Sequence, residues 1–590
     1  MTNRLYYGDN LEILRKEIKD ETVDLIYLDP PFNSKRDYNL LFRTPKGHES
    51  DAQITAFEDT WHWGPQAERE FFELQQQPNT DVAQMMQALR DFLGTNDMMA
   101  YLTMMANRLL EMQRVLKPTG SLYLHCDPTA SHYLKIVLDG VFGKEQFKNE
   151  IVWRRTGAHN ATKSYGPIHD IILFYTKFET YTFNLIRRPY MRGHVESRYT
   201  KQLDGRYKFT SGGNVLTGAG VTSGPSGEVW RGFNPTKKKR HWAVPTFYED
   251  LMPEDYKKLN SVEKLEALYK AGLIEIDGKS EWPIMVRYLG ERDGTVLQDI
   301  WAYQPYTEGT VAGTETGIDE DVKWYGPTDP DRLGYPTQKP LGLLERIVQV
   351  SSNEGDVVLD PFCGCGTAVH AAEKLKRRWI GIDITHLAVS LIERRMKKAF
   401  PYLEAVTPGS KKAMQAGPNA FEVIGVPHDL EAARDLATRD KHQFQLWAVS
   451  LVGAQPYRGG VKGSDKGIDG LIFPEVAKSK TEKIVVSVKG GETVGAAMVR
   501  DLKGVLSREK AAIGLFVTLA SPTKEMVKEA AAAGMYESPH HGAFPKLQIL
   551  TIEGLLSGKQ RAQYPDMAYG AQTFKHAKKE EGVQQQKGLF

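Results

Sequence analysis

A strand that leads into a glycine-rich turn and then a helix is the feature that most limits how this chain can fold. Residues 356–367 (DVVLDPFCGCGT) contain an apolar run, then Asp360, and then Gly364 and Gly366 just before a helix predicted over 368–375. Glycines here let the backbone approach a ligand closely, and the first turn of a helix offers unpaired backbone N–H groups. The pattern predicts a ligand-binding strand–turn–helix unit of an α/β fold.

The next strand, predicted over 379–382, ends in an acidic residue, Asp383. In this topology a carboxylate at that strand end can hold both hydroxyls of a ribose. Strand, glycine turn, helix and strand-end acid together favour a cofactor that contains a nucleoside. No Gly-Lys-Ser/Thr sequence follows the turn, which argues against nucleotide hydrolysis.

A second strand end carries a different kind of motif. The apolar run 23–28 (VDLIYL) is predicted to be a buried strand, and it leads directly into Asp29, Pro30, Pro31 and Phe32. The prolines fix the backbone, so the Asp29 carboxylate and the Pro30 carbonyl can act as two acceptors for the two hydrogens of a base amino group. Phe32 can stack on the base. Alone the tetrapeptide is more often a rigid turn, but beside a nucleoside-cofactor site it predicts a base-amino site.

These motifs and their order resemble the β group of amino-methylating DNA methyltransferases. Over roughly residues 1–400 the chain presents YYGDNLEIL, LIYLDPPFN, a variable region, GYPTQKPLGLLERIV, DPFCGCGT and GIDI. The resemblance implies a Rossmann-like α/β fold that binds S-adenosylmethionine and methylates an amino group of a base rotated out of duplex DNA. It implies a cofactor site formed by Asp9, Asn10, Gln338, Lys339, Asp360, Phe362, Gly364, Gly366, Thr367 and Asp383.

Within this site the resemblance implies particular roles. Asp9 is expected to contact the cofactor adenine, and Gln338 and Lys339 are expected near its methionine part. The turn of the family usually reads GSGTT, whereas this chain has GCGTA, with Cys365 and Ala368 as the departures. These replacements are compatible with cofactor binding.

The cysteines and the catalytic motif bear on which base is methylated. Cytosine C5 methylation needs a cysteine nucleophile after a proline, and none of the three cysteines (Cys126, Cys363 and Cys365) follows one. Three cysteines are also too few for a disulfide framework, and they lack zinc-site spacing. Similar enzymes with DPP and an aromatic residue mostly modify adenine N6, whereas SPP is more common for cytosine N4. We expect adenine N6, with cytosine N4 as the alternative.

The overall charge does not indicate a polyanion partner, because 76 basic residues face 74 acidic ones and the net charge is +2. Residues 155–330 differ from the rest by their richness in Gly, Arg, Lys and aromatic residues. The resemblance makes this the target-recognition region, whose duplex DNA contacts are expected from Arg231, Lys237, Lys238, Lys239, Arg240 and Trp242.

A further α/β unit follows the methyltransferase motifs. Asp469, and then Ser487 and Lys489 at the end of another apolar strand, resemble the Mrr type of restriction endonuclease, in which an acid pair binds Mg²⁺ and a lysine steadies the attacking water. Asp469 is the expected metal ligand. Serine stands where that family has Glu or Gln, and Gln445 lies where related domains often have Glu. An active nuclease and a nuclease-derived DNA-binding or assembly module both remain open.

The expected organisation follows from these units. It comprises an N-terminal methyltransferase part with the catalytic motif (1–154), the target-recognition region (155–330), the cofactor-binding methyltransferase part (331–406), a linker (407–424), a restriction-endonuclease-like α/β domain (425–565) and a tail (566–590). No apolar run approaches the roughly 20 residues that span a bilayer, and no secretory signal is recognised, so we expect a cytoplasmic protein without a membrane role. Homodimer formation and partners from a restriction or defence system stay open.

Overall fold

The structure is a computed structural model of the chain, and its contacts divide the chain into two compact units. One comprises Met1–Asn184, Asp299–Ala302 and Asp321–Phe590, and the other comprises Leu185–Gln298 and Tyr303–Glu320. The residues that the structure describes are 2–31, 38–43, 49–57, 62–157, 163, 165–188, 190–209, 216–278, 282–290, 294–304, 317–326, 329, 331–333, 335, 337–408, 419–457, 467–472, 475–477, 480–538, 542–565 and 580.

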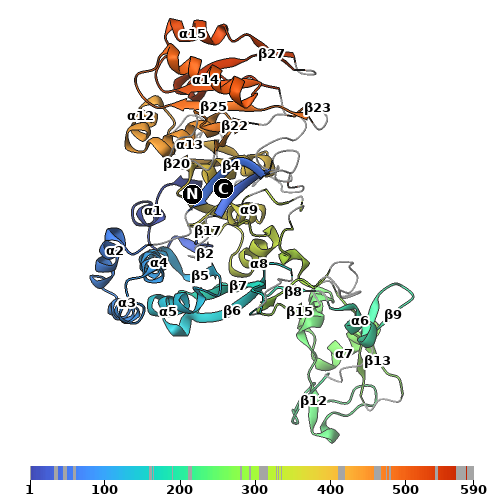
Figure 1. Cartoon of the computed structure of the whole chain (residues 1–590). Helices are drawn as coiled ribbons and strands as arrows, with labels where there is room; N and C mark the ends of the chain where they lie inside the picture. Colours follow the sequence, from blue (N-terminus) through green and yellow to red (C-terminus); the bar gives the residue numbers. More distant parts are fainter. Residues whose placement is uncertain are drawn as a thin grey trace. The chain divides into compact units, whose positions relative to one another are not determined.

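In the described part of the chain, the first unit is built around a ten-stranded sheet (Figure 1). In pairing order its strands are β16 (Ile300–Trp301), β6 (Phe147–Arg154), β7 (His169–Thr176), β5 (Leu116–Cys126), β2 (Val23–Leu28), β17 (Val357–Asp360), β18 (Arg378–Asp383), β1 (Asn3–Tyr7), β20 (Ala420–Ile424) and β19 (Glu404–Val406). β7 runs antiparallel to both of its neighbours, and the other pairs are parallel. The expected Rossmann-like α/β architecture is confirmed.

Helices cover both faces of this sheet. One hydrophobic cluster joins the sheet to α1 (Asn10–Glu17), α2 (Pro65–Gln75), α3 (Thr80–Leu93), α4 (Asp97–Val115) and α5 (Ser131–Phe142). A second cluster joins the opposite face to α8 (Leu341–Ser351), α9 (Thr367–Lys374) and α10 (His386–Ala399). Because both faces are covered, the ends of the parallel strands are where a ligand can reach the sheet.

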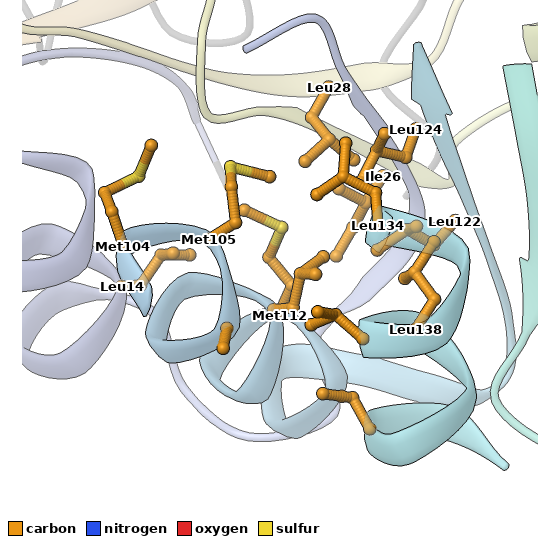
Figure 2. Close-up of a cluster of buried hydrophobic side chains, with 14 of the residues drawn as sticks. Leu14, Ile26, Leu28, Met104, Met105, Met112, Leu122, Leu124, Leu134 and Leu138 are labelled. Carbon is orange, nitrogen blue, oxygen red and sulfur yellow. The ribbon is translucent and has the colours of Figure 1, made fainter. Parts of the chain in front are cut away.

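The alternation of side chains along β2 explains why its sequence is apolar throughout. Leu25 and Tyr27 belong to one cluster, while Ile26 and Leu28 belong to the other. Figure 2 shows Ile26 and Leu28 among the methionine and leucine side chains of α4, α5 and β5. Each such side chain contributes about 1.5–3 kcal/mol on burial. The strand is therefore anchored from both faces, which fixes the position of the residues that follow it.

α4 begins at Asp97, because the Asn96 side chain accepts a hydrogen bond from the backbone nitrogen of Met99 and caps the helix. One boundary of the expected organisation differs in the structure. The interpretation of 407–424 as a linker does not hold for Ala420–Ile424, which form β20 beside β1. Burial of Phe421 and Val423 stabilises this added strand.

The first unit contains a second sheet near its C-terminal end, whose described strands are β21 (Gln455–Pro456), β22 (Gly470–Ile472), β25 (Ile484–Lys489), β26 (Ile513–Thr518) and β29 (Leu547–Thr551). Its helices are α12 (Leu430–Arg439), α13 (Lys441–Leu451), α14 (Ala496–Glu509), α15 (Lys524–Ala531) and α16 (Ile552–Leu556). Short two-stranded ribbons accompany the two sheets, namely β3 (Tyr38–Arg43) with β4 (Glu49–Phe57), β23 (Glu475–Ala477) with β24 (Lys480–Thr481), and β27 (Met535–Ser538) with β28 (Gly542–Pro545). The predicted C-terminal α/β domain is confirmed.

The second unit has little regular structure and a small aromatic core. Its longer elements are α6 (Arg192–Arg198) and α7 (Ser261–Lys270), and its short strands are β8 (Arg187–Arg188), β9 (Tyr199–Lys201), β10 (Tyr207–Phe209), β11 (Thr217–Ala219), β12 (Arg240–Trp242), β13 (Ile274–Glu275), β14 (Ile284–Met285) and β15 (Thr295–Val296). The core includes Trp230, Trp242, Tyr248 and Tyr256. Among the described residues, no helix has the length and apolar character needed to span a membrane.

Candidate active site

The direction in which the chain moves through the large sheet reverses at one position. From β17 the chain continues through α9 to β18 on one side, whereas from β2 it continues to β5 on the other side. Open α/β sheets bind ligands at such a reversal, outside the carboxyl ends of the strands. Asp29 follows β2 there, while Asp360 and Asp383 end β17 and β18. Three sequence-predicted acids therefore gather at one edge of the sheet.

The two carboxylate oxygens of Asp29 lie in different surroundings. Its Oδ2 forms an ion pair with the ammonium group of Lys339, whose side chain is only 9% exposed. Its Oδ1 is buried and has no hydrogen-bond partner among the described residues. Pro30 is buried and Pro31 partly buried beside it, whereas Phe32 lies outside the described residues. Sequence reasoning did not find the pairing of Asp29 with Lys339.

Asp360, at the end of β17, is buried, and its Oδ1 accepts a hydrogen bond from the backbone nitrogen of Phe362 at 3.0 Å. Burial raises the pKa of Asp360 well above its usual range, and the nearby charge of Asp29 acts in the same direction. Burial therefore favours the uncharged form of Asp360. Phe362 is partly buried and packs against the core on the α4 face.

Behind Asp29 lies a buried polar chain that was not predicted. The hydroxyl of Tyr27 lies 3.0 Å from Nδ1 of His125, and Nε2 of His125 lies 3.1 Å from Oδ2 of Asp170. Arg155 forms an ion pair with the same carboxylate. Although burial acts in the opposite direction, the hydrogen bond from His125 and the charges of Lys339 and Arg155 lower the pKa of Asp170. These contacts tie together β2, β5 and β7 at the site.

Asp383 connects two strand ends. Its Oδ2 accepts a hydrogen bond from the backbone nitrogen of Gly364 at 2.8 Å, and its Oδ1 accepts from the backbone nitrogen and hydroxyl of Thr385. Desolvation raises the pKa of Asp383 to about 6, although these hydrogen bonds lower it. The carboxyl lies where a ribose-binding acid is expected, and its lone pairs have fixed directions.

The glycine turn has the backbone that the sequence predicted. Gly364 has φ of 51° and Gly366 has φ of 75°, both in the left-handed region that favours glycine. A Cβ on Gly364 would lie 3.3 Å from the ring of Tyr335, and a Cβ on Gly366 would lie 2.8 Å from Ile392. Buried Arg395 holds the turn by donating to the carbonyl of Cys365 and the hydroxyl of Thr367.

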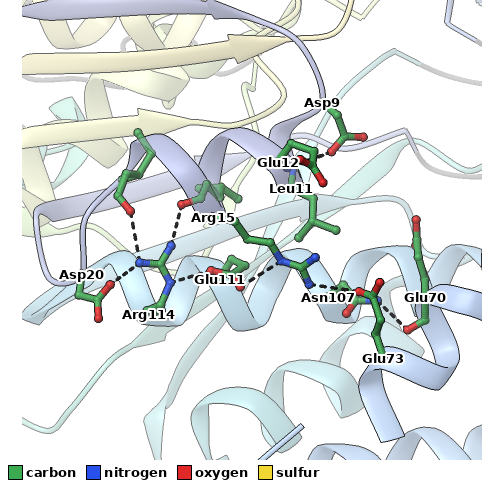
Figure 3. Close-up of polar contacts among 12 residues, drawn as sticks. Asp9, Leu11, Glu12, Arg15, Asp20, Glu70, Glu73, Asn107, Glu111 and Arg114 are labelled. Carbon is green, nitrogen blue, oxygen red and sulfur yellow. Dashed lines mark hydrogen bonds and ion pairs between the residues drawn. The ribbon is translucent and has the colours of Figure 1, made fainter. Parts of the chain in front are cut away.

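The remaining predicted cofactor residues make structural contacts around this edge. Asp9 caps α1, because its side chain accepts from the backbone nitrogen of Leu11 at 2.8 Å (Figure 3), and it forms an ion pair with Arg108. Asn10 donates to the carbonyl of Pro361 at 2.8 Å, which joins α1 to the segment after β17. Gln338 accepts from the nitrogen of Leu333 and donates to the carbonyl of Asp331.

The predicted DNA-contacting residues lie in the second unit, in differing environments. Lys237, Lys238 and Lys239 are exposed on a short turn before β12. Arg231 is paired with Glu266, and Arg240 donates to Thr217. Trp242 is buried, and its indole nitrogen donates to the carbonyl of Glu228. Its ring packs in the core of the unit and is not available for stacking on a base in this conformation.

The nuclease candidates meet at one edge of the C-terminal sheet. Gly470 pairs with Val486 in antiparallel register, which puts Asp469 opposite Ser487, and Lys489 ends the same strand β25. Asp469 accepts hydrogen bonds from the backbone nitrogen of Val488 at 2.7 Å and from the Gln445 side chain at 3.1 Å. Nowhere in the described residues do three or more His, Cys, Asp or Glu side chains form a group suited to a metal ion.

Comparison with known families gives this arrangement a context. Residues 23–394 match the DNA methylase family of the N6/N4 type. The chain belongs to this family. Residues 436–537 of this DNA methylase match a restriction endonuclease family, which agrees with the C-terminal sheet.

Several individual proteins are similar to this DNA methylase. Type II methyltransferase M.EcaI of Enterobacter cloacae is 28% identical over 402 residues, which are 67% of this chain and 69% of the relative. The Mod subunit of the type III restriction-modification enzyme StyLTI of Salmonella typhimurium is 26% identical over 387 residues, and the match covers 63% of this chain and 50% of the relative. Among solved structures, the PvuII DNA methyltransferase, described as cytosine-N4-specific, has a TM-score of 0.31 at 11% identity, and the match covers 72% of this chain and 95% of that chain.

Proposed function

We propose that this DNA methylase transfers a methyl group from S-adenosylmethionine to N6 of adenine at specific sites in duplex DNA. The observation that carries the proposal is the buried Oδ1 of Asp29, for which the described residues provide no hydrogen-bond partner. Leaving a buried acceptor unpaired costs about 1–3 kcal/mol. Such a cost is expected where a ligand completes the hydrogen bond, and a base amino group is a donor of the required kind.

The proposed roles around the target base follow from this acceptor. Asp29 Oδ1 and the Pro30 carbonyl accept the two amino hydrogens and turn the nitrogen lone pair toward the methyl carbon. When the new N–C bond forms, the bond between the methyl carbon and the cofactor sulfur would break, and the sulfur would leave as a neutral thioether. The nitrogen then gives up one proton, for which Asp29 Oδ1 is the proposed first acceptor. Phe32 is proposed to stack on the rotated base.

The cofactor would supply an electrophilic methyl group. Its binding is supported by the close backbone approach at Gly364 and by the fixed acceptors of Asp383 at the neighbouring strand end. We assign the ribose hydroxyls to Asp383 and the adenine to Asp9. The other proposed contacts are Asn10, Gln338, Asp360, Phe362, Gly364, Gly366 and Thr367.

Adenine is proposed over cytosine because Asp29 begins a DPP-aromatic motif, whereas cytosine N4 enzymes more often have SPP. Base-resolution methylation sequencing of DNA from cells that express the protein tests base and target sequence together. N6-methyladenine at a defined sequence is the expected result. N4-methylcytosine would correct the base, and the absence of both modifications would contradict methyl transfer itself.

Duplex DNA is the proposed partner of the second unit, with Lys237, Lys238 and Lys239 as phosphate contacts, because they are exposed and carry like charge on one turn. Their replacement by Gln should weaken DNA binding and lower its dependence on salt. Arg231 and Arg240 are proposed as base or phosphate contacts. To bind DNA, Arg231 would have to release Glu266, and Arg240 would have to release Thr217. Assembly into a homodimer or with restriction partners would be consistent with this role, and a cytoplasmic location fits it.

The C-terminal sheet supports a second, conditional proposal. Asp469 and Lys489 reach the same edge of the sheet, as in Mg²⁺-dependent restriction endonucleases. Ser487 stands where a second acid is expected, so we propose that this module engages DNA without cutting it. A nicking assay with Mg²⁺ on methylated and unmethylated plasmid decides between engagement and cleavage.

A further inference from the structure

Lys339 is a buried lysine whose position in the sequence gives no hint of its partner. It lies just before α8, and its ammonium group contacts Oδ2 of Asp29, which is 310 residues away in the chain. Lys339 as a whole is 8% exposed. A buried ammonium group is costly unless a carboxylate and further acceptors surround it, and the carbonyl of Thr337 at 3.4 Å is one such acceptor.

The ion pair makes the two oxygens of Asp29 unequal. One oxygen is held by a charged donor, while the other has no hydrogen-bond partner within the described part of the chain. A free carboxylate rotates about its Cβ–Cγ bond and presents either oxygen. A charge-assisted hydrogen bond to one oxygen restricts this rotation and fixes where the other oxygen points.

We propose that Lys339 is a positioning residue for catalysis: it holds Oδ2 of Asp29 so that Oδ1 is presented to the amino group of the target base. This inference rests on the proposed methyl transfer. It gives Lys339 a partner in the catalytic motif, in place of the cofactor contact that the family resemblance implies. The lysine acts through Asp29 and need not touch the base.

The surrounding charges support this role. The charge of Asp29 contributes to the raised pKa of Asp360, and the charge of Lys339 lowers the pKa of both Asp170 and Asp360 against the effect of burial. Asp170 has its own cation in Arg155, and Asp360 accepts a hydrogen bond from the backbone nitrogen of Phe362. Asp29 is thus the carboxylate that depends on Lys339 for its orientation.

The chain offers a matched control on the same strand. Lys117 contacts both oxygens of Asp24 at 2.8 Å, and Asp24 lies at the start of β2, whereas Asp29 follows its end. Lys117→Met therefore removes a lysine–aspartate pair from β2 without touching the candidate site. Lys339→Met removes the pair at the site, and Lys339→Arg keeps a cation and donors there.

The experiment measures two quantities for each folded variant of the full chain: the cofactor Kd by calorimetry, and the single-turnover rate of methyl transfer at saturating S-adenosylmethionine and DNA. For Lys339→Met we expect a rate about 100-fold lower, as for a misplaced catalytic group, and a cofactor Kd within about threefold of wild type. Lys339→Arg should recover most of the rate. Lys117→Met should equal wild type in both quantities, and thermal unfolding confirms that each variant is folded.

The possible results separate the inference from the proposed function. Weakened cofactor binding with a normal saturated rate would make Lys339 a cofactor ligand and overturn the inference. A rate in Lys339→Met equal to wild type would also overturn it. If Lys339→Met does not fold, a saturated rate in Lys339→Arg equal to wild type supports the inference, and a rate as low as that of Asp29→Ala contradicts it. Failure of the wild-type protein to methylate any DNA would instead refute the proposed function, and this inference with it.

Discussion

Asp383, the last residue of β18, accepts a hydrogen bond at 2.8 Å from the backbone nitrogen of Gly364, in the turn that follows β17. The other oxygen of the carboxylate accepts two hydrogen bonds from Thr385. The contact joins two neighbouring strand ends and fixes the directions of the remaining lone pairs. A ligand with two adjacent hydroxyls would therefore meet preoriented acceptors at the glycine turn.

Replacement of Asp383 by Ala should weaken cofactor binding about 10- to 100-fold, because hydrogen bonds to a charged acceptor contribute about 1.5–3 kcal/mol. The rate of methyl transfer at saturating cofactor should change little, since Asp383 is proposed to hold the cofactor ribose and not the target base. Calorimetric titration gives the affinity. Asp356→Ala is the control, because Asp356 accepts a backbone hydrogen bond from Asn353 at the opposite end of β17. Equal cofactor affinity of the wild-type protein and Asp383→Ala would show that Asp383 does not bind the cofactor.

The pKa of Asp383 predicts a pH dependence of cofactor binding. Desolvation raises this pKa to about 6, from an ordinary value of 3.8. Below pH 6 the carboxyl is increasingly protonated and loses acceptor capacity, so affinity should fall as pH decreases and reach a plateau above about pH 7. Asp383→Asn, which cannot titrate, should bind more weakly but without this change near pH 6. If cofactor affinity changes with pH in the same way in both proteins, the titration belongs to another group.

Asp29→Ala should lower the rate of methyl transfer by at least about 1000-fold, because both the oriented acceptor and its charge are lost. The cofactor Kd should stay within about threefold of wild type, since Asp29 is proposed to act on the target amino group. Asp29→Asn keeps one acceptor oxygen and should lie between Ala and wild type. A filter-binding assay, which counts the labelled methyl groups transferred to DNA, measures the rate. Full activity of Asp29→Ala would reject the catalytic assignment.

The parts of the site that sequence reasoning found are those set by short-range patterns. The turn at Gly364 and Gly366 follows from glycine spacing, and Asp383 follows from the end of the next apolar strand. The helix predicted over 368–375 corresponds to α9, which spans Thr367–Lys374. In each case, local backbone preference and side-chain periodicity agree with the tertiary fold.

The contacts that sequence reasoning missed join residues far apart in the chain. Lys339 meets Asp29 across 310 positions, and Arg108 meets Asp9 across 99. No periodicity encodes such pairs, because they depend on how separate elements meet at a sheet edge. For Trp242, in contrast, a local pattern suggested the wrong environment. Its basic neighbours suggested a DNA-binding surface, whereas its ring fills the core of the second unit.

Gly364→Val should abolish cofactor binding and also lower stability. Gly364 has φ of 51°, where a branched side chain is strained, and a Cβ there would lie 3.3 Å from the ring of Tyr335. The strain costs roughly 1–2 kcal/mol, so the melting temperature should fall. Gly491→Ala is the control, since a Cβ at Gly491 meets no described atom within 4 Å. Calorimetry and thermal unfolding check both effects, and unchanged affinity in a folded Gly364→Val protein would contradict the role of the turn.

The C-terminal sheet should not cut DNA in the wild-type protein. Asp469 already accepts hydrogen bonds from Val488 and Gln445, and Ser487, opposite it, provides no carboxylate. A metal ion would therefore be held by one acid where Mg²⁺-dependent endonucleases use two. We expect methylation but no nicking of plasmid with Mg²⁺ or Mn²⁺, whatever the methylation state of the DNA.

The same edge of the sheet gives a gain-of-function test. Ser487→Glu restores a second acid beside Asp469 and should produce Mg²⁺-dependent nicking, because Lys489 already ends the same strand. Adding Lys489→Ala to that variant should abolish the nicking and leave methylation unchanged, since the two activities would use separate sheets. Nicking by the wild-type protein that disappears in Lys489→Ala would instead show that one acid suffices and that modification and cleavage are combined in this chain.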